Sequence, residues 1–312
     1  MLDVSIIIVN WNTEKLLIQC LDSIYKTGSR YSFEVIVVDN GSRDDSVTLV
    51  ARQFPSVVLI RNNENLGFAR ANNQGLSVGK GRYFMLLNSD TIVLQGAIDA
   101  LIQVADAHPE LGVVGPTLLN MNGTVQKSWS SFPSFISELL GRNFRIRRPV
   151  PNQVNAYDVD WIMGACMLVR TETIADVGVL DDDYFFYAEE LDWCFRMKRK
   201  NWSIWYITDA EIYHLGGGST NRGSLAQLAR LYQGKLIYFN KYHGPYETIL
   251  LRYGLAIGNA LGVVRRIIFF NWKNKEAAWQ RIINQSRLVW CLLWNQYPDT
   301  GMMTPNKISN EA

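Results

Sequence analysis

The tetrapeptide Leu87-Asn88-Ser89-Asp90 directly follows the apolar run Tyr83-Phe84-Met85-Leu86. Such a run is typical of a buried strand, so the polar turn places the Asp90 carboxylate at the carboxyl edge of a sheet. Open α/β sheets bind their ligands at this edge. One hard oxygen ligand there suits Mg²⁺ or Mn²⁺ shared with a diphosphate. The alternative is an ordinary Ser/Asp turn before a helix predicted over residues 95–108.

The segments before this strand repeat the same strand–helix unit. Apolar strands are predicted at Val4–Val9, Val35–Val38 and Val57–Ile60. Helical spacing of apolar residues separates the strands, at about 13–26, 44–54 and 69–78. This alternation predicts an α/β fold with a mostly parallel, Rossmann-like sheet flanked by helices. No G-x-G-x-x-G follows the first strand, so a dinucleotide-dependent oxidoreductase loses its main support.

Polar residues follow each predicted strand, and they are expected to share one site. Asn10-Trp11-Asn12 offers amides and an aromatic face to a planar ligand. Asp39 can accept a hydrogen bond from a pyrimidine N3–H, although an Asx turn with Asn40-Gly41 is the favoured explanation when Asp39 is taken alone. In the amide-rich stretch 62–75, Arg70 and the helix N-terminus can meet a diphosphate. Asn73 lies on the same helical face as Arg70.

Taken together, these motifs resemble the family-2 inverting glycosyltransferases, and most of all the rhamnosyltransferase-like branch of bacterial cell-surface polysaccharide synthesis. The resemblance covers roughly residues 4–220. It rests on an ordered set of segments: Val4-Ser5-Ile6-Ile7-Ile8-Val9-Asn10-Trp11-Asn12, Val38-Asp39-Asn40-Gly41-Ser42, Asn65-Leu66-Gly67-Phe68-Ala69, Ala71-Asn72-Asn73-Gln74-Gly75 and Leu87-Asn88-Ser89-Asp90.

The resemblance implies a GT-A fold, a dTDP- or UDP-sugar donor and Mg²⁺ or Mn²⁺ as cofactor. It implies that Asp39 contacts the base and that Asp90 holds the metal and the ribose. The usual metal motif is Asp-x-Asp, and Asn88 stands at its first position, so Asp90 alone carries the charge. The donor-binding residues predicted in this way, with those expected from the strand edges, are Val9, Asn10, Trp11, Asp39, Asn65, Gly67, Arg70, Asn73, Ser89, Asp90, Gly164 and Ala165.

Three acids after a Phe/Tyr cluster are the candidates for catalysis. Acids in the first turn of a helix are favoured by the helix dipole, which is the simpler explanation of Glu189, Glu190 and Asp192. On a helix, Glu189 and Asp192 share a face, whereas Glu190 points about 100° away. An inverting transfer needs one general base. The resemblance places that base in an acidic pair that is usually Glu-Asp. We therefore predict Glu190 first, Glu189 second and Asp192 third.

His214 is the candidate second metal ligand. A lone histidine is more often structural, but three glycines and two hydroxyl residues follow this one, at 216–220. Such a loop can approach a phosphate. The matching histidine in related GT-A enzymes completes the metal shell, so the resemblance pairs His214 with Asp90.

Composition narrows the remaining choices. The net charge of +2 gives no nucleic-acid signature, and a hydrophobic content of 48% supports a full core. The four cysteines form no C-x-x-C pair, which argues against a zinc site or a disulfide framework. No signal peptide is recognised, and no uncharged apolar run reaches the roughly 18 residues of a spanning helix. A cytoplasmic protein is predicted, with peripheral attachment to the inner face of the membrane left open.

We predict a catalytic domain over 1–224, with a nucleotide-binding half over about 1–115 and an acceptor half over about 116–224. A helical extension follows over 225–312. Its Trp, Tyr and Leu beside Arg and Lys fit a membrane surface, a helical cap and an oligomer interface about equally well. The basic, aromatic loop at 141–149 suits an anionic acceptor or membrane.

The predicted function is transfer of a sugar, rhamnose or another hexose, to a hydroxyl of a glycan or lipid-linked acceptor. Two other functions stay open. One is a non-catalytic nucleotide-sugar-binding partner in a polysaccharide assembly complex. The other is a sugar nucleotidyltransferase, although the chain lacks the Gly-rich, basic loop that a nucleoside triphosphate needs after the first strand.

Overall fold

The computed structural model describes residues 2–140, 146–153, 155–216, 224–270 and 275–297. Three of the predicted features fall wholly or partly outside these ranges. They are most of the basic loop at 141–149, the glycine and hydroxyl residues at 217–220, and residues 298–312 of the predicted helical extension.

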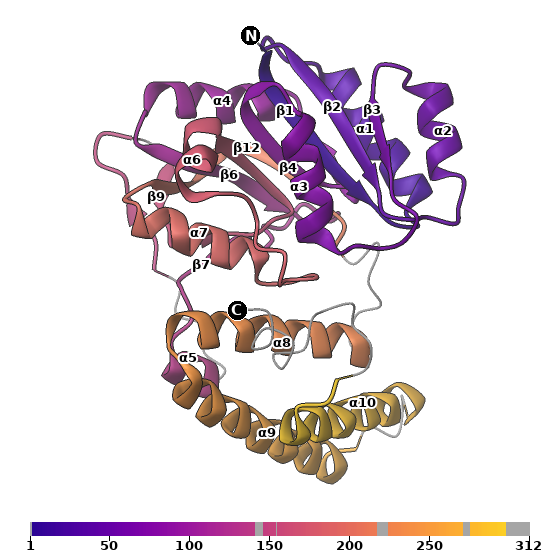
Figure 1. Cartoon of the computed structure of the whole chain (residues 1–312), viewed down its shortest axis with the longest axis vertical. Helices are drawn as coiled ribbons and strands as arrows, with labels where there is room; N and C mark the ends of the chain where they lie inside the picture. The colour runs from indigo at the N-terminus through magenta and orange to yellow at the C-terminus, as the bar shows by residue number, and fades with distance from the viewer. Residues whose placement is uncertain (1, 141–145, 154, 217–223, 271–274, 298–312) are drawn as a thin grey trace. The chain divides into compact units, whose positions relative to one another are not determined.

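The first part of the chain alternates strands and helices (Figure 1). Its elements are β1 (Leu2–Asn10), α1 (Glu14–Thr27), β2 (Phe33–Asp39), α2 (Ser46–Gln53), β3 (Val58–Arg61), α3 (Phe68–Val78), β4 (Gly81–Asn88), β5 (Thr91–Val93), α4 (Ala97–Ala107) and β6 (Leu111–Leu119). Each predicted strand and helix of this region is confirmed, with ends that move by no more than two residues.

The later elements include several short strands and the C-terminal helices. They are β7 (Trp129–Ser130), α5 (Phe135–Leu139), β8 (Arg148–Pro149), β9 (Ala156–Asp158), β10 (Trp161–Ile162), β11 (Cys166–Arg170), α6 (Thr171–Val177), α7 (Glu189–Arg199), β12 (Ser203–His214), α8 (Leu225–Tyr242), α9 (Pro245–Ile268) and α10 (Lys275–Trp294). Strand β12 continues to His214, although its uninterrupted apolar run covers only residues 204–207. Polar residues at 208, 209 and 211 concealed the continuation, because the second half of the strand alternates buried and exposed positions.

The main sheet has the order β3-β2-β1-β4-β11-β6-β12-β9-β8. The pairs β3-β2, β2-β1, β1-β4 and β6-β12 are parallel, whereas β11 runs antiparallel to both of its neighbours. A short strand, β5, pairs with the far end of β12. The sheet is thus mostly parallel, as predicted, and its antiparallel insert brings the start of β11 to the carboxyl end of β4.

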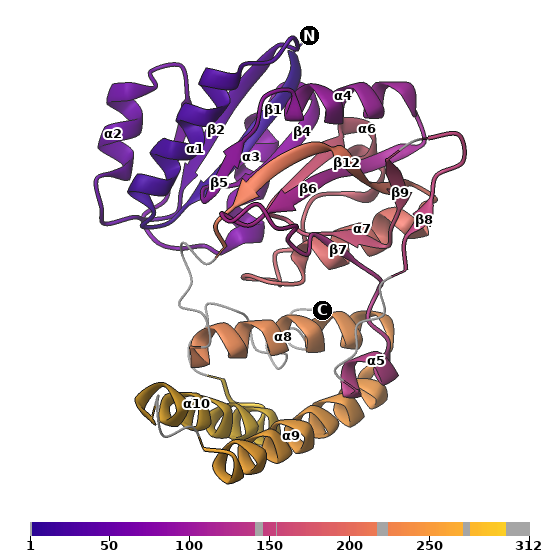
Figure 2. The same ribbon diagram turned by 180° about the vertical axis from the view of Figure 1, so that it is seen from behind.

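Helices cover both faces of this sheet (Figures 1 and 2). Alternate residues of each central strand enter different cores: Ile6 and Ile8 pack with α1 and α4, while Ile7 packs with α3, α6 and α7. This division explains why the central strands are continuous apolar runs rather than alternating ones. Helix α3 approaches closely, because a Cβ on Gly75 would lie 2.5 Å from Ile7 Cγ2.

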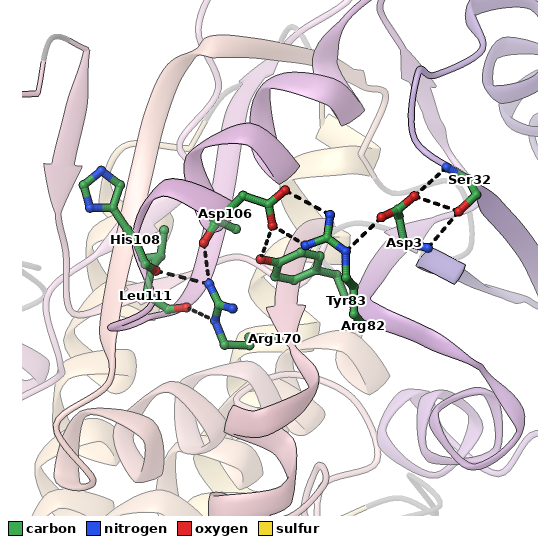
Figure 3. A network of polar contacts seen from close by, with 9 residues as sticks. Asp3, Ser32, Arg82, Tyr83, Asp106, His108, Leu111 and Arg170 are labelled. Carbon is green, nitrogen blue, oxygen red and sulfur yellow. Dashed lines mark hydrogen bonds and ion pairs between the residues drawn. The ribbon is translucent and has the colours of Figure 1, made fainter. Parts of the chain in front are cut away.

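A polar network ties the amino ends of β1 and β4 to α4 (Figure 3). The Arg82 guanidinium donates to Asp3 at 2.8 Å and to both carboxylate oxygens of Asp106, and Tyr83 Oη donates to Asp106 at 2.8 Å. Hydrogen bonds from Ser32 and Arg82 lower the pKa of Asp3 to about 2. The network lies at the edge opposite to the predicted site, so its role is structural.

The chain divides into two compact units. One comprises Met1–Phe132, Arg145–Asp182 and Glu189–Ser219, and the other Pro133–Phe144, Asp183–Ala188 and Thr220–Ala312. Within the second unit, α8, α9 and α10 pack on one another through Phe239, Leu251, Leu255 and Leu288. An ion pair of 2.5 Å between Lys235 and the buried Glu138 joins α8 to α5. The functional division into 1–115, 116–224 and 225–312 stays a prediction.

Candidate active site

Parallel pairing of β1, β2 and β4 brings together the polar residues at the carboxyl ends of these strands. Asn10 of β1 pairs with Asp39 of β2, and Val9 pairs with Asn88 of β4. Asn10 and Asp39 are buried, and Ser89 and Asp90 are each 7% exposed. The carboxyl edge of the sheet therefore collects the residues that the sequence predicted for it.

Asp39 is held by a chain of hydrogen bonds. Asn10 Nδ2 donates to Asp39 Oδ1 at 2.8 Å, and the Ser42 backbone N–H donates to Asp39 Oδ2 at 3.0 Å. Thr13 Oγ donates to Asn10 Oδ1 at 2.7 Å and lies 2.9 Å from Ser89 Oγ. The carboxylate is thus fixed in direction and connected to the turn that carries Asp90.

Sequence reasoning missed Thr13 and Asn40. Thr13 precedes α1 and reads as a helix cap, yet its side chain makes no capping bond and turns to Asn10 instead. Asn40 is 2% exposed, and its amide contacts Asn65 Oδ1 at 2.9 Å and the Gly67 carbonyl at 3.1 Å. Asn65 and Gly67 are therefore positioned by Asn40, and the Asx-turn reading of 39–41 had concealed this role.

Asp90 and His214 meet although they are far apart in the sequence. His214 Nε2 lies 3.3 Å from Asp90 Oδ1 and 3.5 Å from Asn88 Nδ2. The Leu215 backbone N–H donates to the Asp90 carbonyl at 2.9 Å. His214 reaches this point because β12 extends to it and pairs with β5, next to the turn.

Gln126 determines which nitrogen of His214 faces Asp90. The Gln126 amide nitrogen donates to the His214 carbonyl at 3.2 Å and to Asn120 Oδ1 at 3.0 Å. Its oxygen then faces His214 Nδ1, at 2.5 Å, and must accept a hydrogen bond from it. In neutral imidazole, Nε2 is left as a lone pair directed at Asp90. The sequence offered no signal for Gln126, which lies between β6 and β7.

These residues fit a divalent cation. A carboxylate oxygen and an imidazole lone pair lie side by side, and Gln126 supplies the second hydrogen-bond partner that metal-binding histidines usually have. Among the residues that the structure describes, no group of three His, Cys, Asp or Glu side chains could hold a metal alone. A cation here would therefore complete its shell with phosphate oxygens and water, as Mg²⁺ commonly does.

Gly164 and Ala165 connect the strand edge to the acidic helix α7. The Asn88 backbone N–H donates to the Ala165 carbonyl at 2.9 Å. A Cβ built on Gly164 would lie 3.5 Å from the Phe68 ring and 3.7 Å from Glu190 Cβ. Gly164 therefore stands between the start of α3 and the predicted base, where a larger residue would narrow the space.

The three acids of α7 have different surroundings. Glu189 is 4% exposed, and its Oε2 has no hydrogen-bond partner among the residues that the structure describes. Burial together with the Glu190 charge raises the pKa of Glu189 well above the usual range. Glu190 is half-buried. Asp192 is fully buried and accepts a hydrogen bond from Arg196 at 2.8 Å. Arg196 also donates to the Val177 and Val179 carbonyls, so Asp192 helps to fix the loop before α7.

Other predicted residues lie at the same edge with structural contacts of their own. Asn73 exchanges hydrogen bonds with Leu180 and donates to Asp182 at 2.8 Å. Arg70 lies 3.8 Å from Asp182 in the first turn of α3. Trp11 is half-buried beside Asn10. The amide of Asn73 is thus occupied by the loop at 180–182, whereas the Arg70 side chain remains 42% exposed.

The comparison with known families decides the identity. The profile described as Glycosyl transferase family 2 matches residues 5–178, more than half of the chain. The chain belongs to glycosyl transferase family 2. The match includes Asn10, Asp39, Asp90, Gly164 and Ala165 and ends before α7 and His214.

Among characterised family-2 relatives, the chain is 29% identical to the N-acetylglucosaminyl-diphospho-decaprenol L-rhamnosyltransferase of Mycobacterium tuberculosis. That match covers 73% of this chain and 81% of the relative. This chain is also 27% identical to the low-salt glycan biosynthesis hexosyltransferase of Haloferax volcanii, over 68% of this chain and 67% of the relative.

Solved structures confirm the GT-A fold of this family-2 chain. A mannosyltransferase from Pyrobaculum calidifontis, determined with GDP-Man and Mn²⁺, superposes with a TM-score of 0.56 at 16% identity. The superposition covers 94% of this chain and 87% of the mannosyltransferase chain. GalNAc-T7, determined with UDP, GalNAc and Mn²⁺, gives a TM-score of 0.56 at 14% identity, over 69% and 43% of the two chains.

Proposed function

We propose that this glycosyltransferase transfers a hexose from a dTDP- or UDP-sugar to a hydroxyl of a glycan or lipid-linked acceptor, with inversion and with a divalent metal. The observation that carries the proposal is the convergence of Asp39, Asp90 and His214 at one sheet edge, with Glu190 beside Gly164. Rhamnose is the first choice of sugar, because a relative matched over most of both chains is an L-rhamnosyltransferase.

In this proposal the donor lies along the carboxyl edge. Asp39, fixed by Asn10 and Ser42, accepts the pyrimidine N3–H. Trp11 stands beside the base, and Arg70 with the start of α3 faces the diphosphate. Asp90 and His214 would hold Mg²⁺ or Mn²⁺, which neutralises charge on the leaving diphosphate. Two solved GT-A structures that contain Mn²⁺ support this choice of cofactor.

Glu190 is the proposed general base. The acceptor oxygen attacks the anomeric carbon, the bond from that carbon to the diphosphate oxygen breaks, and the acceptor proton passes to Glu190. Burial and the Glu190 charge raise the pKa of Glu189, so this side chain holds its proton more tightly than an exposed glutamate does.

The names of the relatives also support a role in the synthesis of lipid-linked glycans. The mycobacterial relative uses a diphospho-decaprenol acceptor, and the Haloferax relative serves glycan biosynthesis. We therefore propose a role in polysaccharide assembly at the cytoplasmic face of a membrane. No helix in the described ranges is both long and apolar enough to cross a bilayer.

Calorimetric titration with UDP, dTDP, GDP and CDP tests the donor site, first with Mn²⁺ and then with a chelator. Metal-dependent, pyrimidine-selective binding is expected, and Asp90→Ala should abolish it. Asp22→Ala is the control, because Asp22 is partly exposed on α1 and pairs only with Lys26 in the described contacts. Absence of binding to all four nucleotides would contradict the proposal.

Two other functions make different predictions. A non-catalytic partner in an assembly complex would bind the nucleotide sugar but release no nucleoside diphosphate in the presence of acceptor extracts. A sugar nucleotidyltransferase would release pyrophosphate from a nucleoside triphosphate and a sugar phosphate. Measuring the release of each product separates both functions from sugar transfer.

A further inference from the structure

Helix α9 has two apolar faces within the second unit. One face, with Leu251 and Leu255, is buried against neighbouring helices. The opposite face is exposed, yet apolar residues recur along its whole length at steps of three and four residues. Its members and their exposed fractions are Tyr246 84%, Leu250 61%, Tyr253 43%, Ile257 62%, Leu261 66%, Val264 52% and Ile268 68%. A long exposed apolar stripe of this kind marks a surface that contacts a partner or a lipid interface.

Helix α10 adds a second exposed stripe. It consists of Trp279, Ile283, Trp290 and Trp294, which follow helical spacing and are 40–65% exposed. An apolar cavity of about 500 Å³ lies where α9 ends and α10 begins, lined by Ile267, Phe270, Lys275, Glu276 and Trp279. We call the two stripes together the α9–α10 surface. Aromatic rings with one polar edge are characteristic of the membrane–water interface.

Charge indicates the partner of this surface. Residues 245–294 contain seven Lys or Arg and two Glu. Arg265 and Lys275 are exposed near the end of the α9 stripe, and Arg287 lies on the flank of the α10 stripe, whereas Arg266 donates to Gln285 of α10 at 2.9 Å. A symmetric contact between two copies would bring these like charges together, which is unfavourable. Anionic lipid head groups attract them instead.

We propose that the α9–α10 surface binds the chain to a bilayer that contains anionic phospholipid. The aliphatic and Trp side chains enter the head-group region, and the arginines and Lys275 contact lipid phosphates. The contact is peripheral, since no described helix spans a bilayer. It concerns the second unit alone and does not depend on which sugar the first unit transfers.

Co-sedimentation of the full chain with vesicles tests this surface. We expect binding to phosphatidylcholine vesicles that contain phosphatidylglycerol, much weaker binding to phosphatidylcholine alone, and loss of binding at high salt. Val264→Glu should lower the partition coefficient roughly tenfold, because it places a charge in the apolar stripe. Arg265→Gln should lower it about fivefold, the contribution of one basic residue near an anionic surface.

Val78→Glu is the matched control, because Val78 is 42% exposed at the end of α3 in the other unit. It should bind vesicles as the unchanged chain does, and circular dichroism should show all variants folded. Failure to bind anionic vesicles, or equal binding to both vesicle types, would overturn the proposal. So would a dimer in analytical ultracentrifugation that Val264→Glu dissociates without vesicle binding, since the surface would then join two copies.

Discussion

Gln126 gives His214 a defined chemical role, because it fixes the proton on Nδ1 and leaves Nε2 directed at Asp90. Two lone pairs then face each other at 3.3 Å, an arrangement that is unfavourable without a cation or a proton between them. The glutamine thus acts on the predicted metal only through the histidine.

Replacement of Gln126 tests this role. Gln126→Ala should weaken Mn²⁺ binding in the presence of UDP or dTDP by about 10- to 100-fold, as loss of such an outer partner commonly does. Calorimetry measures this affinity without an activity assay. Gln126→Glu keeps an acceptor for Nδ1–H and should restore most of the affinity, whereas Gln53→Ala on α2 should have no effect. Equal affinity in Gln126→Ala would show that His214 needs no orienting partner.

Glu189 predicts a pH dependence of stability. Its folded pKa lies above its unfolded value, because burial and the Glu190 charge oppose ionisation. The folded state therefore holds the proton more tightly, and its stability falls as pH rises from about 4.5 through the folded pKa. Glu189→Gln removes this penalty. At pH 8 the melting temperature of Glu189→Gln should exceed that of the unchanged chain, by about 2–4 °C for each kcal/mol gained in the free energy of unfolding. The gain should shrink toward pH 5.

The matched control for this measurement is Glu172→Gln. Glu172 also lies in the first turn of a helix, α6, but is exposed. Its melting temperature should follow that of the unchanged chain at every pH. A Glu189→Gln gain that is constant from pH 5 to pH 8 would mean that Glu189 is already ionised in the folded chain at low pH.

Residues at strand ends were predictable, whereas their partners were not. Asp39, Asp90 and Asn10 follow apolar runs, so the sheet alone places them at one edge. Gln126 and Asn40 reach the site through contacts that depend on tertiary folding. A single sequence carries no periodic signal for such contacts. The occupation of Asn73 by Leu180 and Asp182 was hidden for the same reason.

Helix α7 shows how one short element separates the roles of three acids. Glu189, Glu190 and Asp192 all satisfy the same dipole preference, so sequence could order them only by resemblance. The structure gives each a distinct surrounding: Glu189 is buried without a partner at Oε2, Glu190 is near Gly164, and Asp192 is paired with Arg196. Tyr187 and Ala188 have φ values of 78° and 75°, which strains the backbone directly before the helix.

Substitutions in α7 should therefore have opposite effects on rate and stability. Glu190→Gln should keep nucleotide binding and folding but lower turnover about 10²- to 10⁴-fold, the usual contribution of a general base. Asp192→Asn should lower the free energy of unfolding by about 3 kcal/mol, because it breaks a buried ion pair. Its turnover should stay within a few-fold at temperatures where it is folded. Urea titrations and sugar-transfer assays on the same preparations separate the two effects.

The reverse pattern would reassign the base. If Asp192→Asn loses turnover while it stays folded, and Glu190→Gln remains active, the proton acceptor lies on the Glu189 and Asp192 face of the helix. Glu190→Asp provides a further check, because the resemblance expects Asp at this position. It should retain part of the activity.

At the scale of the whole molecule, the fold class followed from the sequence, and the two compact units did not. Repeated strand–helix units identify a parallel sheet because each unit has a fixed handedness. By contrast, the second unit takes Pro133–Phe144 and Asp183–Ala188 from the interior of the chain. These segments join the second unit through contacts between residues that are far apart in the sequence. Examples are the ion pair of Lys235 with Glu138 and the close approach of Gly234 to the Tyr187 carbonyl.

The two proposed functions should be separable, because each rests on contacts within its own unit. Effects of distant sites that share no partners usually add to within about 0.5 kcal/mol. Val264→Glu should therefore lower vesicle binding and leave the Kd for Mn²⁺ and the preferred nucleotide within about twofold. Asp90→Ala should abolish nucleotide binding and leave the vesicle partition coefficient within about twofold of its original value. Both quantities can be measured on one preparation by calorimetry and co-sedimentation. If one substitution lowers both in a chain that circular dichroism shows to be folded, the units are energetically coupled and lipid regulates the transferase site.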